Sequence, residues 1–137
     1  MYERILAAID ESEIAERVLA ATQELASLSG GEVWVIHVVE REPSKYLTST
    51  TESSEDAHAA VDAAVAKLAS AGVTAQGNVA HTLYGYAARE IISFAKSHDI
   101  GVIVMGSRGR GDLAGLLVGS TAHKVIHLTD RPVVVVR

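Results

Sequence analysis

The chain of 137 residues is 48% hydrophobic and 21% charged, which excludes a disordered protein and predicts one folded domain over residues 1–137. Its formal net charge of -5 argues against nucleic-acid binding, and the absence of cysteine excludes disulfides and thiolate metal sites. No apolar run approaches the roughly 20 residues of a membrane helix, and residues 1–5 do not resemble a signal peptide, so we expect a cytoplasmic protein with no membrane partner.

Five short runs rich in β-branched residues alternate with segments of helical periodicity. The runs are residues 4–9, 33–39, 73–79, 102–105 and 133–136. This alternation predicts parallel strands joined by crossover helices. We therefore expect a single-domain, doubly wound, Rossmann-like α/β fold, with a five-stranded parallel sheet in the order 3-2-1-4-5 and helices on both faces. The first, second and fourth strands are expected at the centre, whereas the polar alternation of the third predicts an edge.

Helical periodicity predicts a helix after each of the first four strands. The second begins near Ser53, the third near Tyr86, and the fourth covers residues 120–128. The first presents an apolar stripe to the sheet, made of Ile14, Val18, Ala21, Leu25 and Leu28. The fourth is expected to turn Ala122, Val125 and Ile126 inward.

Two segments are expected to be loops. Residues 41–54 include Pro43 and a stretch rich in serine and threonine without apolar periodicity, which predicts the most mobile part of the molecule. Residues 80–85 follow the third strand and are expected to form a second loop, whose conformation the sequence leaves open.

The fourth strand is followed by a glycine-rich segment. Residues 105–120 hold five of the eleven glycines of the chain. In parallel α/β sheets, ligands bind beyond the carboxyl ends of the strands, where helix N-termini direct free N–H groups at them. Glycine lets the backbone approach a phosphate closely, Ser120 can offer a hydroxyl, and Arg108 and Arg110 add positive charge. The segment therefore predicts a phosphate site.

Other motifs fit less well. The chain has no Gly-Lys pair, which excludes a P-loop, and the loose dinucleotide match at residues 109–114 follows the wrong strand. His123 and His127 are four residues apart, a metal-ligand spacing, but they lack the glutamate of a zinc protease helix, so a structural metal is a minor alternative. We expect His37, within a buried strand, to be a core histidine with its hydrogen bonds satisfied.

The pattern G-x2-G-x9-G-S is met in register by Gly106, Gly109, Gly119 and Ser120. On these residues the sequence resembles the universal stress protein family, in its ATP-binding branch, and the strand segments extend the resemblance over the whole chain. The resemblance implies a bound ATP, with Mg²⁺ or Mn²⁺ as a possible companion. AMP or another adenine nucleotide is left open.

The resemblance also implies roles for residues at the ends of the first, second and fourth strands. Asp10 is similar to the carboxylate near the adenosine, with Ile9 beside it in the binding set. Val38 is similar to the backbone position that reads adenine. Met105 and Gly106 are similar to the wall of the adenosine pocket. From the residues alone, Asp10 could instead cap the first helix, since Asp is a favoured N-cap.

On the phosphate side, Gly109, Gly119 and Ser120 resemble the family's phosphate cradle. Thr121 continues it where the family often has valine, and Arg108 contributes charge. These residues complete the candidate set, in which no catalytic residue and no metal ligand is assigned.

Three functions remain open at this point. The first is a nucleotide-dependent regulator of the stress response, as the resemblance implies. The second is a slow metal-dependent ATP hydrolase, for which Asp112 is the only carboxylate near the glycines. The third is a structural interaction module without a ligand. We also expect a homodimer through Val133–Val136, because an apolar terminal strand at a sheet edge exposes unpaired backbone groups.

Overall fold

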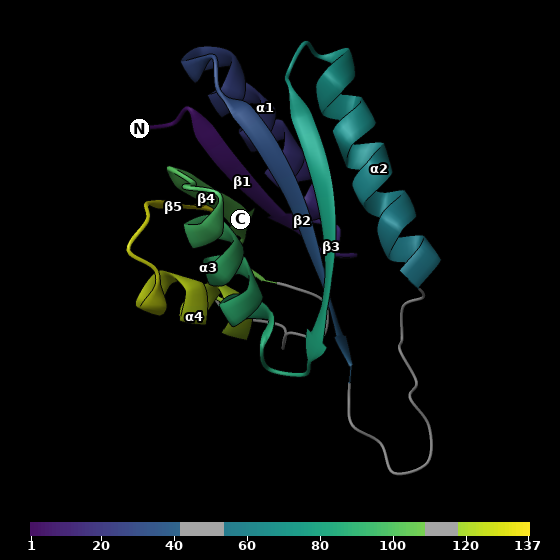
Figure 1. Ribbon diagram of the computed structural model, residues 1–137, viewed down its shortest axis with the longest axis vertical. Helices are drawn as coiled ribbons and strands as arrows, with labels where there is room; N and C mark the ends of the chain where they lie inside the picture. The colour runs from purple at the N-terminus through teal and green to yellow at the C-terminus, as the bar shows by residue number, and fades with distance from the viewer. Residues whose placement is uncertain (42–53, 109–117) are drawn as a thin grey trace.

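The computed structural model describes residues 1–41, 54–108 and 118–137 (Figure 1). Strands and helices alternate along the chain, as the periodicity predicts. Their order is β1 (Arg4–Ile9), α1 (Ala15–Ser29), β2 (Glu32–Arg41), α2 (Ser54–Ser70), β3 (Ala75–Leu83), α3 (Ala87–Ser97), β4 (Val102–Gly106), α4 (Ser120–Leu128) and β5 (Val133–Val136).

The strands form one five-stranded sheet in the order β3-β2-β1-β4-β5, and every neighbouring pair is parallel. This confirms the predicted topology, with β1 at the centre and β3 and β5 at the edges. The register pairs Ala8 of β1 with Ile36 of β2 on one side and with Met105 of β4 on the other. The carboxyl ends of the three central strands therefore lie together at one edge of the sheet.

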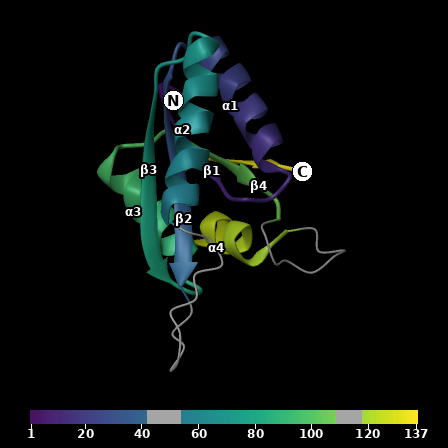
Figure 2. The same ribbon diagram turned by 90° about the vertical axis from the view of Figure 1, so that its right-hand side faces the viewer.

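Helices cover both faces of the sheet, as expected. Residues of α1 and α2 pack with Ile5, Val33 and Val104 in one apolar cluster, and residues of α3 and α4 pack with Leu6 and other strand residues in a second. Figure 2 shows α1 and α2 side by side on their face of the sheet. Each of these fully buried aliphatic side chains stabilises the fold by about 1.5–3 kcal/mol.

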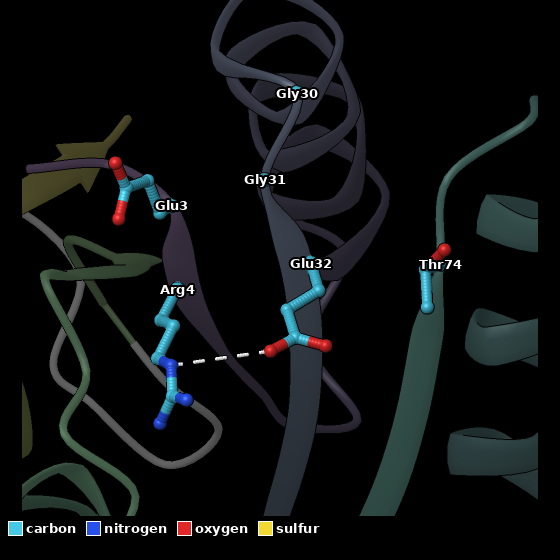
Figure 3. A pocket seen from close by; sticks show the side chains of 6 residues that line it. All are labelled: Glu3, Arg4, Gly30, Gly31, Glu32 and Thr74. Carbon is cyan, nitrogen blue, oxygen red and sulfur yellow. Dashed lines mark ion pairs between the residues drawn. The ribbon is translucent and has the colours of Figure 1, made fainter.

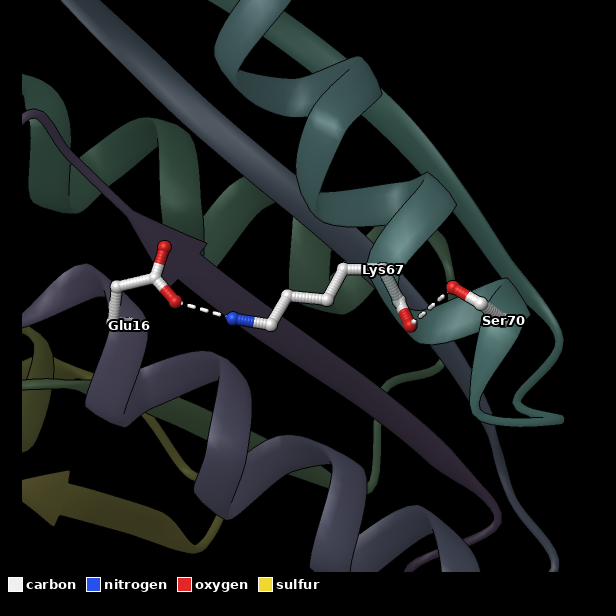
Figure 4. A network of polar contacts seen from close by, with 3 residues as sticks. All are labelled: Glu16, Lys67 and Ser70. Atoms are coloured by element: carbon white, nitrogen blue, oxygen red, sulfur yellow. Dashed lines mark hydrogen bonds and ion pairs between the residues drawn. The ribbon is translucent and has the colours of Figure 1, made fainter.

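The two helices on the first face are also joined at the surface. Lys67 of α2 donates a hydrogen bond to Glu16 of α1, and Ser70 Oγ donates to the Lys67 carbonyl oxygen at 3.2 Å (Figure 4). Both charged side chains are more than half exposed, so this pair contributes at most about 1 kcal/mol. The packing of the two helices therefore rests mainly on their buried apolar residues.

Two predicted inward positions are wrong. Leu28 is 81% exposed, because the buried face of α1 follows Val18, Thr22 and Ala26, and position 28 lies roughly 200° round the helix from Ala26. Ile126 is 45% exposed. The short helix α4 packs chiefly against α3, and within it only Ala122 and Val125 are buried.

The expected loop at residues 80–85 is mostly strand. β3 continues to Leu83 because β2 continues to Arg41, and the two residues are paired in the parallel ladder. Tyr84 N–H then donates to the Arg41 carbonyl oxygen at 2.9 Å, and the turn follows at Gly85, whose φ of +90° suits glycine. The other expected loop lies almost wholly at residues 42–53, outside the described residues, so its mobility stays a prediction.

Candidate functional site

The end of β4 is tied directly to the start of α4. Gly119 N–H donates to the carbonyl oxygen of Ser107, which is the residue after β4 and is only 3% exposed. Ser107 N–H in turn donates to the carbonyl oxygen of Val136 in β5 at 2.7 Å. These backbone bonds fix the N-terminus of α4 at the carboxyl edge of the sheet, where the sequence predicts the phosphate site.

The first turn of α4 leaves backbone donors available. Gly119 is the N-cap residue, and its carbonyl oxygen accepts from His123 N–H at 2.9 Å. The N–H groups of Ser120, Thr121 and Ala122 precede this first intrahelical bond and have no partner among the described residues. Three such donors, together with the helix dipole, form an arrangement that binds anions.

This turn changes two details of the sequence-based interpretation. Gly119 N–H is already used by Ser107, so the donors come from the next three residues. Ala122 among them is missing from the predicted site, because an alanine gives no side-chain signal and contributes through its backbone alone. Ser120 is exposed and Thr121 is half-buried at this end of the helix.

The end of β1 is held by a buried histidine. His37 of β2 is 2% exposed, and its Nδ1–H donates to the carbonyl oxygen of Ile9 at 2.8 Å. This confirms the prediction of a core histidine with a satisfied hydrogen bond. Ile9 itself is 8% exposed, so it supports the edge of the sheet and offers little surface to a ligand.

Asp10 follows β1 and turns the chain toward α1. Its Oδ1 accepts from Ser12 N–H at 2.9 Å and also from the Ser12 hydroxyl. α1 begins at Ala15 after the N-cap residue Ile14, which has no side-chain cap, so the alternative of Asp10 as the N-cap of this helix is wrong. The half-buried carboxylate instead stabilises an Asx-type turn at the carboxyl edge.

Two other predicted residues lie on the face of the sheet that α3 and α4 cover. Val38 and Met105 both belong to the cluster that packs under α3 and α4, and Ala8 lies between their strands. Met105 is 5% exposed and Val38 is half-buried. Gly106 belongs to the other face, where a Cβ would lie 2.6 Å from Cγ2 of Ile14. The expected wall of Met105 and Gly106 is therefore divided between the two faces.

Beyond β4, Arg108 is exposed, and Gly109 lies outside the described residues. Across the described ranges 1–41, 54–108 and 118–137, there is no group of three or more His, Cys, Asp or Glu residues able to hold a metal ion. Past the far end of α4, the hydrogen bond from the Arg131 guanidinium lowers the pKa of the Asp130 carboxyl. The described phosphate side of the site is thus a set of neutral backbone donors with one exposed guanidinium, and the Asp10 carboxylate lies at the same edge of the sheet.

A pocket lies at the opposite, amino end of the strands (Figure 3). It is lined by Glu3, Arg4, Gly30, Gly31, Glu32 and Thr74. An ion pair between Arg4 Nε and Glu32 Oε1, 3.9 Å apart, joins two of these lining side chains, and both are over 40% exposed (Figure 3). Paired surface charges already satisfy one another here, so this pocket is a weaker candidate than the carboxyl edge.

A doubly wound parallel sheet with a free helix N-terminus at its carboxyl edge defines an α/β protein of the Rossmann-like class. Within this class, the model of the universal stress protein family matches residues 1–137, and the chain belongs to that family. None of the described helices is both long and apolar enough to cross a lipid bilayer.

Individual relatives agree with this assignment. Universal stress protein YxiE of Bacillus subtilis is 32% identical over 154 aligned residues, which cover 100% of both chains. Universal stress protein MJ0577 of Methanocaldococcus jannaschii is 28% identical over 100% of this chain and 96% of its own. Its solved structure has a TM-score of 0.83 to this fold. The universal stress protein from Archaeoglobus fulgidus in complex with dAMP has a TM-score of 0.75 and 27% identity, covering 99% of this chain and 98% of that one.

Proposed function

We propose that this protein binds an adenine nucleotide, ATP in particular, at the carboxyl edge of the sheet, and acts as a nucleotide-dependent regulator in the stress response. The observation that carries the proposal is the first turn of α4, beside the end of β4, where the N–H groups of Ser120, Thr121 and Ala122 have no partner in the part of the chain that the structure describes. The dAMP complex of the Archaeoglobus fulgidus relative supports an adenine nucleotide as the ligand class.

In this proposal the nucleotide spans the three central strand ends of one nucleotide-binding domain, residues 1–137. The phosphates lie at the N-terminus of α4, where the donors are backbone N–H groups and the hydroxyls of Ser120 and Thr121, with Gly119 and Arg108 alongside. Gly109 is kept in the proposed phosphate set and lies outside the described residues. The adenosine lies toward Asp10, with Ile9, Val38, Met105 and Gly106 around it. Charge-assisted hydrogen bonds of this kind are each worth about 1.5–3 kcal/mol.

A divalent cation, Mg²⁺ or Mn²⁺, would be coordinated mainly by the phosphates of the nucleotide and not by a dedicated set of protein ligands. Mg²⁺ commonly keeps several waters and takes most of its other ligands from substrate phosphates. The absence of a three-ligand metal cluster among the described residues is compatible with that mode. Slow hydrolysis of ATP remains the alternative activity, and a single-turnover measurement with labelled ATP distinguishes it from binding alone.

The decisive test starts from the protein as purified, which is denatured so that any bound ligand is released and identified by mass spectrometry. Calorimetric titration of the emptied protein with ATP, ADP, AMP and dAMP, with and without Mg²⁺, then ranks the nucleotides. An adenine nucleotide in the extract, or saturable heat with one of them, supports the proposal. An empty extract and no heat with any of the four would leave the structural interaction module in its place.

We also propose that the protein is a cytoplasmic homodimer paired through β5 and has neither nucleic acid nor membrane as a partner. β5 is an edge strand with one parallel neighbour, β4, and Val134 at its centre is 41% exposed. Its outer backbone groups are available to a second copy, and two valine strands would bury apolar side chains against each other.

A further inference from the structure

Two exposed histidines lie next to each other on α4. His123 and His127 are four residues apart, so they lie one helical turn apart on the same side of the helix. Their imidazole rings are stacked, with centroids 5.4 Å apart and planes inclined by 20°. No hydrogen bond joins either ring to another residue within the described ranges. The two rings are therefore already side by side, with their nitrogens available.

This separation suits a chelate. A metal ion binds imidazole nitrogen at about 2.0–2.1 Å, so two nitrogens at a tetrahedral angle are about 3.4 Å apart. The ring planes are inclined by 20°, and the nitrogen lone pairs lie in those planes, so both exposed side chains must rotate before one nitrogen of each ring points at a shared ion. Residues one helical turn apart are close enough for their side chains to meet in this way. We propose that His123 and His127 form a two-histidine site for a divalent transition-metal ion such as Cu²⁺, Ni²⁺ or Zn²⁺, with water completing the coordination.

The surrounding charges permit a cation there. His127 lies in the last turn of α4, where the negative end of the helix dipole favours positive charge. Lys124 is the neighbouring cation in sequence, but its Nζ donates to the carbonyl oxygen of Gly85 in the β3–α3 turn at 3.2 Å. That bond directs the ammonium group toward α3. Because both histidines are exposed, binding does not require burial of a charge.

The expected metals differ from those that accompany a nucleotide. Neutral imidazole is a ligand for Cu²⁺, Ni²⁺ and Zn²⁺, whereas Mg²⁺ takes oxygen ligands. The affinity of one such nitrogen site follows the order Mn²⁺ below Ni²⁺ below Cu²⁺. The two sites thus differ in the metals that they favour, although Ala122, whose N–H belongs to the proposed nucleotide site, directly precedes His123 in α4.

The test uses the tag-free, full-length protein without nucleotide in a buffer that does not coordinate metals. Calorimetric titration with Cu²⁺ should give one principal site. His123→Ala and His127→Ala should each weaken Cu²⁺ affinity by about a hundredfold, because the remaining imidazole binds the ion alone, without the gain from a second ligand on the same helix. His58→Ala is the matched control. His58 is also an exposed histidine on a helix, and its ring is within 2.7 Å of the Ser54 carbonyl oxygen.

Electron paramagnetic resonance of the Cu²⁺ complex gives a second, structural readout. The native protein should show hyperfine splitting from two equivalent nitrogens, and each single variant should show one. Circular dichroism confirms that the variants are folded, as expected for exposed side chains. The proposal is overturned if either single variant binds Cu²⁺ as tightly as the native protein, if His58→Ala weakens binding equally, or if the native spectrum contains no pair of nitrogens.

Discussion

Gly106 at the end of β4 and Ile14 at the start of α1 are in such close contact that a Cβ on Gly106 would lie 2.6 Å from Cγ2 of Ile14. The pattern G-x2-G-x9-G-S assigns this glycine to the nucleotide, yet a branched side chain of the same protein already occupies the space beside it. One reason for glycine at position 106 is therefore the packing of α1 against β4 at the edge of the sheet.

Gly106→Ala should therefore lower the free energy of unfolding, by about 1–3 kcal/mol, because an added methyl overpacks a tight contact. Ile14→Ala removes the clashing atom. The double variant should cost less than the sum of the two single changes, with a coupling of about 0.5–3 kcal/mol. Chemical denaturation of the four proteins measures this cycle.

Gly77→Ala provides the control for that cycle. A Cβ at Gly77 would meet Cγ1 of Val61 at 2.3 Å, a similar clash in another part of the molecule. Ile14→Ala should not relieve it. Strict additivity of Gly106→Ala with Ile14→Ala would mean that the contact is relieved by movement elsewhere.

Ser120→Ala should weaken ATP binding by about ten- to a hundredfold while leaving the fold intact. The change removes one hydroxyl contact to a charged group, roughly 1.5–3 kcal/mol, and retains the backbone donors of the helix end. Ser97→Ala is the matched control, since Ser97 is an exposed helical serine whose hydroxyl donates to the Ser93 carbonyl oxygen at 3.1 Å. Equal ATP affinities in calorimetry for both variants would remove Ser120 from the site.

The sheet could be predicted from the sequence because the apolar pattern within each short segment is enough to identify it as a strand. Residues 33–39 are continuously apolar apart from His37, and a strand of that kind must be covered on both faces. Strand ends were less predictable, because β3 reaches Leu83 only through pairing with Arg41, and no local pattern encodes that partner. Helices show the same limit. Leu28 and Ile126 are apolar but exposed, because the sheet covers only one side of each helix and the sequence does not mark which apolar residues fall outside that side.

The candidate site could be located but not completed from the sequence. Glycines after an apolar strand predict a phosphate site beyond that strand, and the structure places the start of α4 there. The N–H group of Ala122 and the packing of Ile14 on Gly106 have no signature in sequence, because one is a backbone group and the other a contact between elements far apart in the chain.

Asp10→Ala and Asp10→Asn should separate the two roles of this side chain. Asparagine keeps an oxygen that can accept from Ser12 N–H, so it should preserve the turn, whereas alanine should lower stability by about 0.5–1.5 kcal/mol for each lost hydrogen bond. If Asp10 contacts the nucleoside through its charge, both variants should lose ATP affinity. Thermal melts with and without ATP measure both effects, and unchanged affinity in both variants would restrict Asp10 to the turn.

Val134→Lys should convert the proposed dimer to a monomer. Val134 lies at the centre of the edge strand β5, and a lysine placed there opposes strand pairing by a second copy through its charge and its hydration. Leu128→Lys is the control, because Leu128 is a 61% exposed apolar residue outside β5. Light scattering coupled to size-exclusion chromatography should give the mass of two chains for the native protein and for Leu128→Lys, and of one chain for Val134→Lys. A monomeric native protein, or a Val134→Lys variant that remains dimeric, would exclude β5 as the interface.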